Sequence, residues 1–341
     1  MKRDDLEYIE KSLRYISNGG FKIEQHLPAS DEVTLFTEHF RSRTTGKGKI
    51  AVYHIFPGIE IAFNVFLAEQ VSFHHPSSLS VLEINHCRTG RVGWNMKNGT
   101  SGYLGTGDLA LHSMACCADS VMQFPVGYYE GISISVDLKQ LEQKTPDILK
   151  DANISIRKLY QRYCSPDHSI LLPSQQETEY IFALLYDLPE SLRIPYFKLK
   201  VQELLLFLSR IDPKEQELTQ YGSGQTELIK EVHQFLIHNL HQRYTINELS
   251  KRYLINTSSL KEIFKAVYGM PIATYMKEYR MKTAASMLRK TNDNIAQIAA
   301  SVGYGSQSKF SNAFRDIFQV LPTEYRKQYQ SQIPRSELRD I

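Results

Sequence analysis

Amide and hydroxyl side chains are concentrated in one short stretch around residue 310, at intervals that place them on one side of a helix. Such groups hydrogen-bond to the edges of bases, and a guanidinium nearby can bind phosphate. The chemistry that these residue types indicate is recognition of a nucleic acid, without bond making or breaking. The candidate residues are Gln307, Ser308, Ser311, Asn312 and Arg315.

The other side of this stretch is apolar, with residues at intervals of 3, 4 and 7, which is one face of a helix. The stripe is Phe310, Ala313, Phe314 and Ile317. The pattern predicts a helix that starts at Ser306 or Gln307. A shorter helix is predicted from Ile295 to Val302, and Gly303 can take the positive φ that ends it. Together they form a helix-turn-helix motif.

The motif occurs twice. The apolar positions of residues 246–275 match those of residues 295–325, at an offset of 49 before the turn and 50 after it. Such a repeat indicates one supersecondary unit used twice. In the first copy we expect Leu260, Ile263, Phe264 and Val267 to be buried. We expect Ser258, Lys261, Glu262 and Lys265 to be exposed. A single motif of this kind is a common chance match, but two matched copies favour a real one.

A connecting helix is predicted from Pro271 to Lys290, because the period is helical and proline suits the first turn. Twenty residues span about 30 Å at about 1.5 Å each. Successive major grooves on one face of DNA repeat every ~34 Å. The connector is therefore long enough to place two recognition helices in adjacent grooves.

Residues 225–329 resemble the DNA-binding domain of the AraC/XylS family of bacterial transcription regulators. The run YRMKTAASML at 279–288 is similar to the family's connector helix. The run IAQIAASVGY at 295–304, continued by Phe310, Phe314, Pro322 and Tyr325-Arg326, resembles its second-motif signature. The resemblance implies that the base-facing residues are Ser258, Lys261 and Glu262 in the first motif and Gln307, Ser308, Ser311 and Asn312 in the second. Lys265 and Arg315 lie one turn further along each helix.

Two residues depart from the family pattern. Gln319 stands where the family usually has glycine, so we expect the turn before the last helix to differ slightly. Glu262 stands where a basic side chain is common. It could accept from cytosine N4, or it could weaken reading by the first motif. Singly, Ser308, Ser311 and Lys261 could also belong to an ordinary solvated face.

Charge is distributed unevenly along the chain. Residues 225–341 carry 17 Lys and Arg against 10 Asp and Glu, a net charge of +7, whereas residues 1–224 carry 23 against 27, a net charge of −4. The basic C-terminal third suits a polyanion such as promoter DNA.

Residues 50–136 alternate short apolar runs with Gly and Pro, which is typical of an antiparallel sandwich or small barrel. Residues 104–111 resemble the turn into a later strand of cupin-like effector domains. The sequence thus predicts a multi-domain α+β protein. We expect a β-rich, cupin-like sensing domain at 1–140, a helical connector at 141–212, a linker at 213–224 and an all-α double helix-turn-helix domain at 225–330. The leucine-rich helix at 196–211 is expected to be either a dimer contact or the inner helix of its own domain.

The rival hypothesis is a metal-dependent cupin-type enzyme fused to a DNA-binding domain. Such a site needs a His-x-His pair with further ligands. His74 and His75 are adjacent, so in a strand they point to opposite faces. The isolated histidines His54, His86 and His112 are expected to be structural. The cysteines, including the adjacent Cys116-Cys117, show no metal-ligand spacing. We therefore predict no catalytic residues, no metal, no cofactor and no enzymatic activity.

The segment 124–131 is predicted to be either a tyrosine-packed loop or the lining of a ligand cavity, with Tyr128, Tyr129 and Glu130 as ligand-binding candidates. The expected partners are double-stranded promoter DNA, a small-molecule effector and, for an activator, RNA polymerase. The resemblance favours a homodimer. No apolar run approaches ~20 residues and no signal core follows Met1, so we expect a cytoplasmic protein without a membrane partner.

Overall fold

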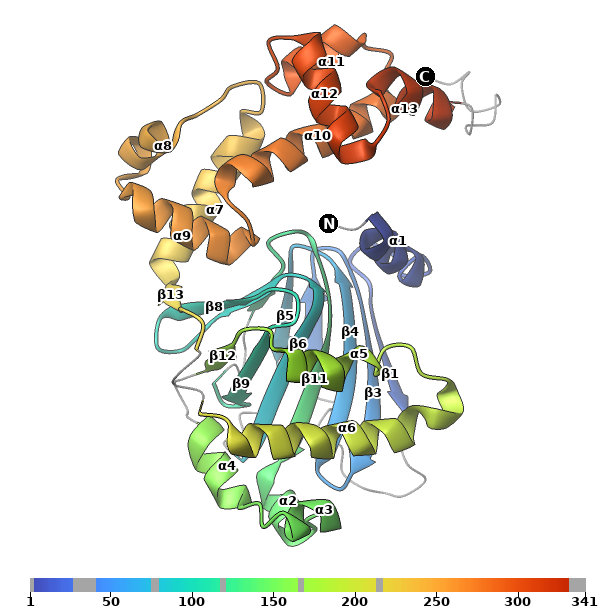
Figure 1. Cartoon of the computed structure of the whole chain (residues 1–341), viewed down its shortest axis with the longest axis vertical. Coiled ribbons are helices and arrows are strands. Elements are labelled where there is room, and N and C mark those ends of the chain that lie inside the picture. Colours follow the sequence, from blue (N-terminus) through green and yellow to red (C-terminus); the bar gives the residue numbers. More distant parts are fainter. Residues whose placement is uncertain are drawn as a thin grey trace. The chain divides into compact units, whose positions relative to one another are not determined.

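The computed structural model describes residues 3–26, 41–74, 80–116, 121–164, 169–212 and 217–330. The chain divides into two compact units, Met1–Ser223 and Gly224–Ile341 (Figure 1). The N-terminal unit is rich in β-strands and the described part of the C-terminal unit is helical, which confirms the predicted fold class. His75 and Cys117 lie outside the described residues.

The strands of the N-terminal unit are β1 (Phe21–His26), β2 (Arg41–Thr44), β3 (Lys47–Phe56), β4 (Ile59–Leu67), β5 (Gln70–His74), β6 (Val81–Gly90), β7 (Val92–Asn95), β8 (Thr100–Leu104), β9 (Leu109–Ser113), β10 (Val121–Gln123), β11 (Tyr128–Asp137), β12 (Ile170–Leu172) and β13 (Tyr221–Gly222). They form a seven-stranded sheet in the order β1-β3-β4-β11-β6-β9-β12 and a six-stranded sheet in the order β13-β8-β7-β10-β5-β2. β1 pairs in parallel with β3, and the neighbouring β3 and β4 are antiparallel.

The helices of this unit are α1 (Arg3–Ser12), α2 (Leu138–Gln143), α3 (Asp147–Asp151), α4 (Ile156–Tyr163), α5 (Gln176–Ala183) and α6 (Glu190–Arg210). The segment 141–212, predicted as a helical connector, is largely helical but also contains β12, which pairs with β9. It is therefore part of the β-rich unit.

The predicted linker at 213–224 also differs from expectation in its described part. The backbone N–H of Leu218 donates to the carbonyl of Leu171 at 2.7 Å, and Tyr221–Gly222 pairs with β8. Backbone hydrogen bonds hold this stretch to the sheets, and such bonds leave no pattern in the side chains. A polar stretch with glycine therefore gave the appearance of a free linker.

Alternation along the strands creates two cores, one on each face of the seven-stranded sheet. Phe66, Trp94 and Tyr129 belong to the core between the two sheets. Ile132 and Phe197 belong to the core between the outer face and the helices, where α6 lies across the sheet (Figure 1). The helix α6 is thus fixed to the sheet by its apolar face.

A row of polar side chains crosses the inner face of the seven-stranded sheet. Cross-strand pairing aligns His54, Glu60, Ser135, Glu83 and His112 on five consecutive strands. His54 Nε2 lies 3.1 Å from the Glu60 carboxylate, and His112 Nε2 lies 3.0 Å from the side-chain nitrogen of Asn85. Both histidines have partners inside the protein, as buried polar groups require.

The helices of the C-terminal unit are α7 (Ser223–His238), which starts one residue before the boundary, α8 (Ile246–Tyr253), α9 (Thr257–Tyr268), α10 (Ile272–Lys290), α11 (Ile295–Ser301), α12 (Gln307–Phe318) and α13 (Pro322–Gln330). The pairs α8–α9 and α11–α12 are the two predicted motifs, and α10 is the predicted connector. Pro271 and Ser306 occupy the N-cap positions of α10 and α12, without a side-chain cap hydrogen bond.

Candidate nucleic-acid interface

Local hydrogen bonds fix where the helices of the two motifs start. The hydroxyl of Thr245 accepts from the N–H of Glu248, whose carboxylate accepts from the N–H of Thr245. Asn294 and Gln297 make the same reciprocal cap on α11. Such capping boxes satisfy N–H groups that the first helical turn leaves without partners. The first helix of each motif therefore begins in the same way.

Equivalent residues also adopt the left-handed conformation in both copies. Leu254 ends α8 with a φ of 51°, and Gly303 follows α11 with a φ of 79°. Gly269 ends α9 at 83° and Gln319 ends α12 at 61°. Gln319 thus adopts the left-handed backbone usually left to glycine, with a φ 22° smaller than that of Gly269. An L-residue in this conformation costs roughly 1–2 kcal/mol.

The predicted inward stripes are the cores of the motifs. Leu260, Phe264, Phe310 and Phe314 are fully buried. The second stripe packs against Ala284 and Leu288 of α10, and Phe314 makes an edge contact with Tyr325 at 5.3 Å between ring centroids. This packing leaves the opposite side of α9 and of α12 facing solvent.

The predicted contact residues lie on those outward sides. Eight of the nine are exposed and Ser311 is half-buried. The exposed residues are Ser258, Lys261, Glu262, Lys265, Gln307, Ser308, Asn312 and Arg315. Within the described ranges, no hydrogen bond or ion pair engages these side chains, so their polar atoms are available to a ligand. The structure arranges them as two separate rows, one on each helix.

Sequence reasoning missed a bridge between the two motifs. Arg280 of α10 donates from Nε to the carbonyl of Leu240 at 3.2 Å and from Nη2 to that of Gln242 at 2.7 Å. Arg243 in the same loop donates to the carbonyl of Gly303 at 3.0 Å. The loop before α8 is thus joined to the turn of the second motif. The one sign of this bridge in the sequence is Arg280 itself, in the run YRMKTAASML.

The bridge explains why residue 303 is glycine. A Cβ added there would lie 2.6 Å from the Leu240 carbonyl oxygen, closer than real Cβ contacts allow. Burial lowers the pKa of the Arg280 guanidinium, and Arg243 lowers it further. Burying the charged guanidinium costs free energy, and the hydrogen bonds to the loop carbonyls compensate part of that cost.

A cleft of about 890 Å³ lies beside the bridge, between α10, the start of α8 and the turn before α12. It is lined by Arg243, Lys277, Arg280 and Lys309, and none of the described residues in the lining is acidic. Lys277 makes an ion pair with Asp316 at 3.3 Å. The cleft adds positive potential next to the start of α12, where Gln307 and Ser308 lie.

The ligand-binding candidates of the N-terminal unit lie on strand β11. Residues 128–131 therefore form part of a strand and not the predicted loop. Tyr129 is fully buried and stacks on Phe124 and Phe66 in the core between the sheets. Glu130 makes an ion pair with Arg88 at 3.1 Å. None of Tyr128, Tyr129 and Glu130 lines the pocket described below. The two tyrosines are buried among neighbouring side chains, an arrangement that the sequence alone did not distinguish from a ligand cavity.

Among the residues that the structure describes, no group of three or more His, Cys, Asp or Glu side chains is arranged to hold a metal ion. Within the same ranges, no helix has the length and apolar character needed to cross a membrane.

Two helix-turn-helix motifs joined by one shared helix define a double helix-turn-helix DNA-binding domain. The helix-turn-helix domain family matches residues 249–328. The Tn10 TetD protein of Escherichia coli is 32% identical over 102 residues, which are 30% of this chain and 74% of that protein. The chain belongs to the AraC/XylS family of bacterial transcription regulators.

Other relatives match over the same region. The transcriptional activator RhaR of Mannheimia succiniciproducens is 28% identical over 127 residues, which are 37% of this chain and 45% of that protein. The C-terminal domain of AraT, a response regulator from Geobacillus stearothermophilus, is 26% identical, covers 30% of this chain and 84% of that one, and superposes with a TM-score of 0.29. The chain thus spans less than half the length of RhaR.

Proposed function

We propose that this protein is a promoter-binding regulator that inserts α9 and α12 into two adjacent major grooves. The observation that carries the proposal is the pair of exposed polar rows on two equivalent helices. Helix α10 joins them with 19 residues, a length of about 28 Å at about 1.5 Å per residue. That length suits groove segments that repeat every ~34 Å on one face of DNA.

Base reading is assigned to the outward residues nearest the start of each helix. Gln307 and Asn312 carry amides that can pair with adenine N6 and N7, and Glu262 can accept from cytosine N4. Arg315, one turn further along, is assigned to phosphate, as is Lys265 on α9. Serine hydroxyls at 258, 308 and 311 can pair with either bases or phosphates.

The test distinguishes residues that recognise bases from residues that contact phosphates. Asn312→Ala or Gln307→Ala should cost about 1–3 kcal/mol at the preferred site and relax the preference at one base pair. Arg315→Ala should weaken all sequences alike and make binding less dependent on salt. Selection of preferred sites by each full-length variant measures both effects. If both amide variants keep the wild-type preference at every base pair, α12 is not the reader and Lys261 and Ser258 must carry specificity.

We further propose that a small-molecule effector acts on the N-terminal unit and changes how DNA-binding units are presented to promoter sites. Regulation by a homodimer is supported by two exposed apolar residues, Leu192 and Leu199, which lie seven positions apart on the outer side of α6. RhaR carries the name of an activator, and by that similarity we propose contact with RNA polymerase at the promoter. Light scattering of the full chain tests the dimer, and transcription in vitro tests activation.

A further inference from the structure

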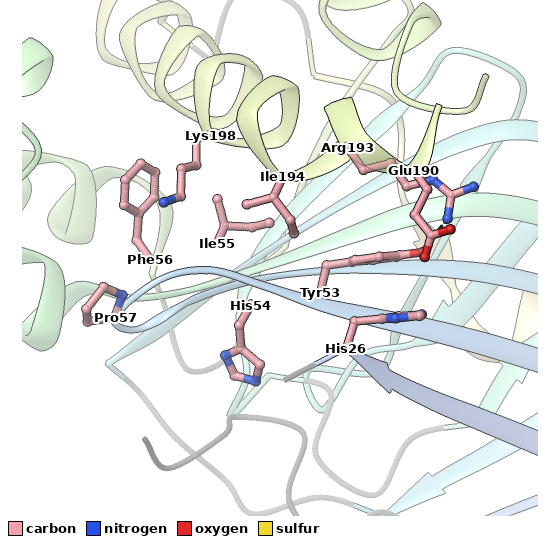
Figure 2. Close-up of a pocket in the computed structure, with 10 residues that line it drawn as sticks. All are labelled: His26, Tyr53, His54, Ile55, Phe56, Pro57, Glu190, Arg193, Ile194 and Lys198. Atoms are coloured by element: carbon pink, nitrogen blue, oxygen red, sulfur yellow. Dashed lines mark hydrogen bonds between the residues drawn. The ribbon is translucent and has the colours of Figure 1, made fainter. Parts of the chain in front are cut away.

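A pocket of about 540 Å³ lies between the end of β3 and the N-terminal half of α6 (Figure 2). This volume is within the range of small-molecule sites, which hold roughly 300–1,000 Å³. Its apolar lining comes from Ile55, Phe56 and Pro57 of the strand and turn, and from Ile194 of the helix. Tyr53 and His26 form one wall, with parallel rings 4.3 Å apart.

The pocket has a cation at each end. Arg193 lies at the Tyr53 end and Lys198 lies beside Phe56, with Ile55 and Ile194 between them (Figure 2). Neither cation has an acidic partner within 4.0 Å in the described part of the chain. Among the described residues that line the pocket, Glu190 is the one acid, and it lies at the Arg193 end. His54 borders the pocket but points to the other side of β3, where it pairs with Glu60.

Arg193 is held in place before any ligand arrives. Its Nη1 donates to the hydroxyl of Tyr53 at 3.1 Å, and its Nε donates to the carbonyl of Leu188 at 3.3 Å. These two bonds leave guanidinium N–H groups that can donate to a carboxylate. Lys198 has its Nζ 5.3 Å from the centre of the Phe56 ring and is otherwise exposed. A preorganised donor and a flexible one thus flank an apolar strip.

We propose that this pocket binds an organic diacid with a flat apolar body, one carboxylate on Arg193 and the other on Lys198. Five positions on α6 separate the two cations, a rise of about 7.5 Å at about 1.5 Å per residue. The ring body lies on Ile55 and Ile194, where it removes apolar surface from water. The claim that such a ligand is the effector rests on the proposed function, whereas its binding to the pocket does not.

Calorimetry on the full chain tests the binding with three rigid probes that share a naphthalene ring: 2,6-naphthalenedicarboxylate, 2-naphthoate and 2-naphthamide. The diacid should bind about tenfold more tightly than the monoacid, and the neutral amide most weakly. Equal affinity for diacid and amide, or no binding of the diacid, overturns the proposal.

Variants assign the binding to the pocket. Lys198→Gln, at an exposed position, should weaken the diacid about tenfold and leave the monoacid nearly unchanged. Glu190→Gln should tighten both acids severalfold, because it removes the opposing charge. The matched control is Lys200→Gln on the same helix, whose ammonium pairs with Glu203 at 2.8 Å outside the pocket. If Lys200→Gln weakens the diacid as much as Lys198→Gln does, the site is not this pocket.

The regulatory part has a separate readout. The diacid at saturation should change the affinity of the full chain for its selected promoter site, and Lys198→Gln should require about tenfold more diacid for the same change. Binding without any effect on DNA affinity would refute the effector role and leave the pocket assigned. Failure to bind DNA at all would refute the proposed function and leave the calorimetry intact.

Discussion

Because Arg280 bridges the two motifs, we expect them to bind DNA as one rigid body. Arg280→Met keeps an unbranched side chain but removes both hydrogen bonds to the loop before α8. The carbonyls of Leu240 and Gln242 then lose a charged donor. The second motif should move more freely relative to the first, since the turn at Gly303 packs on the same loop.

The magnitude follows from the two bonds and their burial. Arg280 is only 8% exposed, and hydrogen bonds to charged groups contribute about 1.5–3 kcal/mol each. Part of the loss is recovered because the methionine stem still packs and water can reach the freed carbonyls. We expect the variant to lower the free energy of unfolding of the C-terminal unit by roughly 3 kcal/mol.

The effect on DNA is a loss of preorganisation. A freer second motif must be ordered at binding, which we expect to weaken the preferred two-groove site about tenfold, or about 1.4 kcal/mol. Sites with one base pair inserted between the two groove segments should lose less affinity in the variant than in wild type. Urea unfolding measures the first effect, and binding to a series of spacer lengths measures the second.

Arg252→Met is the matched control for this prediction. Arg252 stacks over the Phe235 ring at 4.0 Å in the same unit, without bridging the motifs. It should cost about 0.5–1 kcal/mol, as expected for an exposed cation–π contact, and leave the spacer preference unchanged. The reasoning fails if Arg280→Met unfolds like wild type and keeps the same spacer preference.

Gln319→Gly should stabilise the C-terminal unit by about 0.5–1 kcal/mol in urea unfolding, because glycine removes the left-handed strain at the end of α12 despite its greater freedom when unfolded; a destabilised variant would contradict this. Burial, aided by Arg88, lowers the pKa of His86 from 6.5 to about 3. The unfolded chain takes up the proton first, so stability present above pH 6.5 is lost as the pH falls, roughly 2 kcal/mol between pH 7 and 5. His86→Gln should remove that slope, and an unchanged slope would assign it to other groups. Purified protein should contain no stoichiometric iron, manganese or nickel, and a full equivalent found by elemental analysis would revive the metal-enzyme hypothesis.

The helical third of the molecule could be predicted closely from the sequence. Apolar residues at helical intervals, such as Phe310 and Phe314, determine which side of a helix is buried, so the outward side follows directly. Gly303 predicted the end of α11 because few other residues take a positive φ. The DNA contacts of the outward residues stay a prediction.

Other features depended on contacts that sequence spacing does not encode. The pocket beside α6 joins Tyr53 to Arg193, 140 positions apart. The bridge joins Arg280 to a loop 38 to 40 positions earlier through backbone carbonyls, which every residue has. For Tyr128 and Tyr129 the sequence left packing and ligand binding as alternatives, because a buried aromatic and a ligand-lining one have the same side chain. Only the surrounding strands distinguish them.

Helix α10 belongs to both motifs at once. Tyr275 in its first half packs on Phe264, whereas Leu288 in its second half lies in the core with Phe310. Inserting one residue between them would turn the second motif by about 100° about the helix axis and advance it about 1.5 Å. Seven residues would nearly restore the angle and advance it about 10 Å, roughly three base pairs at 3.4 Å each. Insertions in α10 therefore keep the two motifs in the same orientation only at a few lengths. The distances between groove segments that such variants could bind are correspondingly few and widely separated.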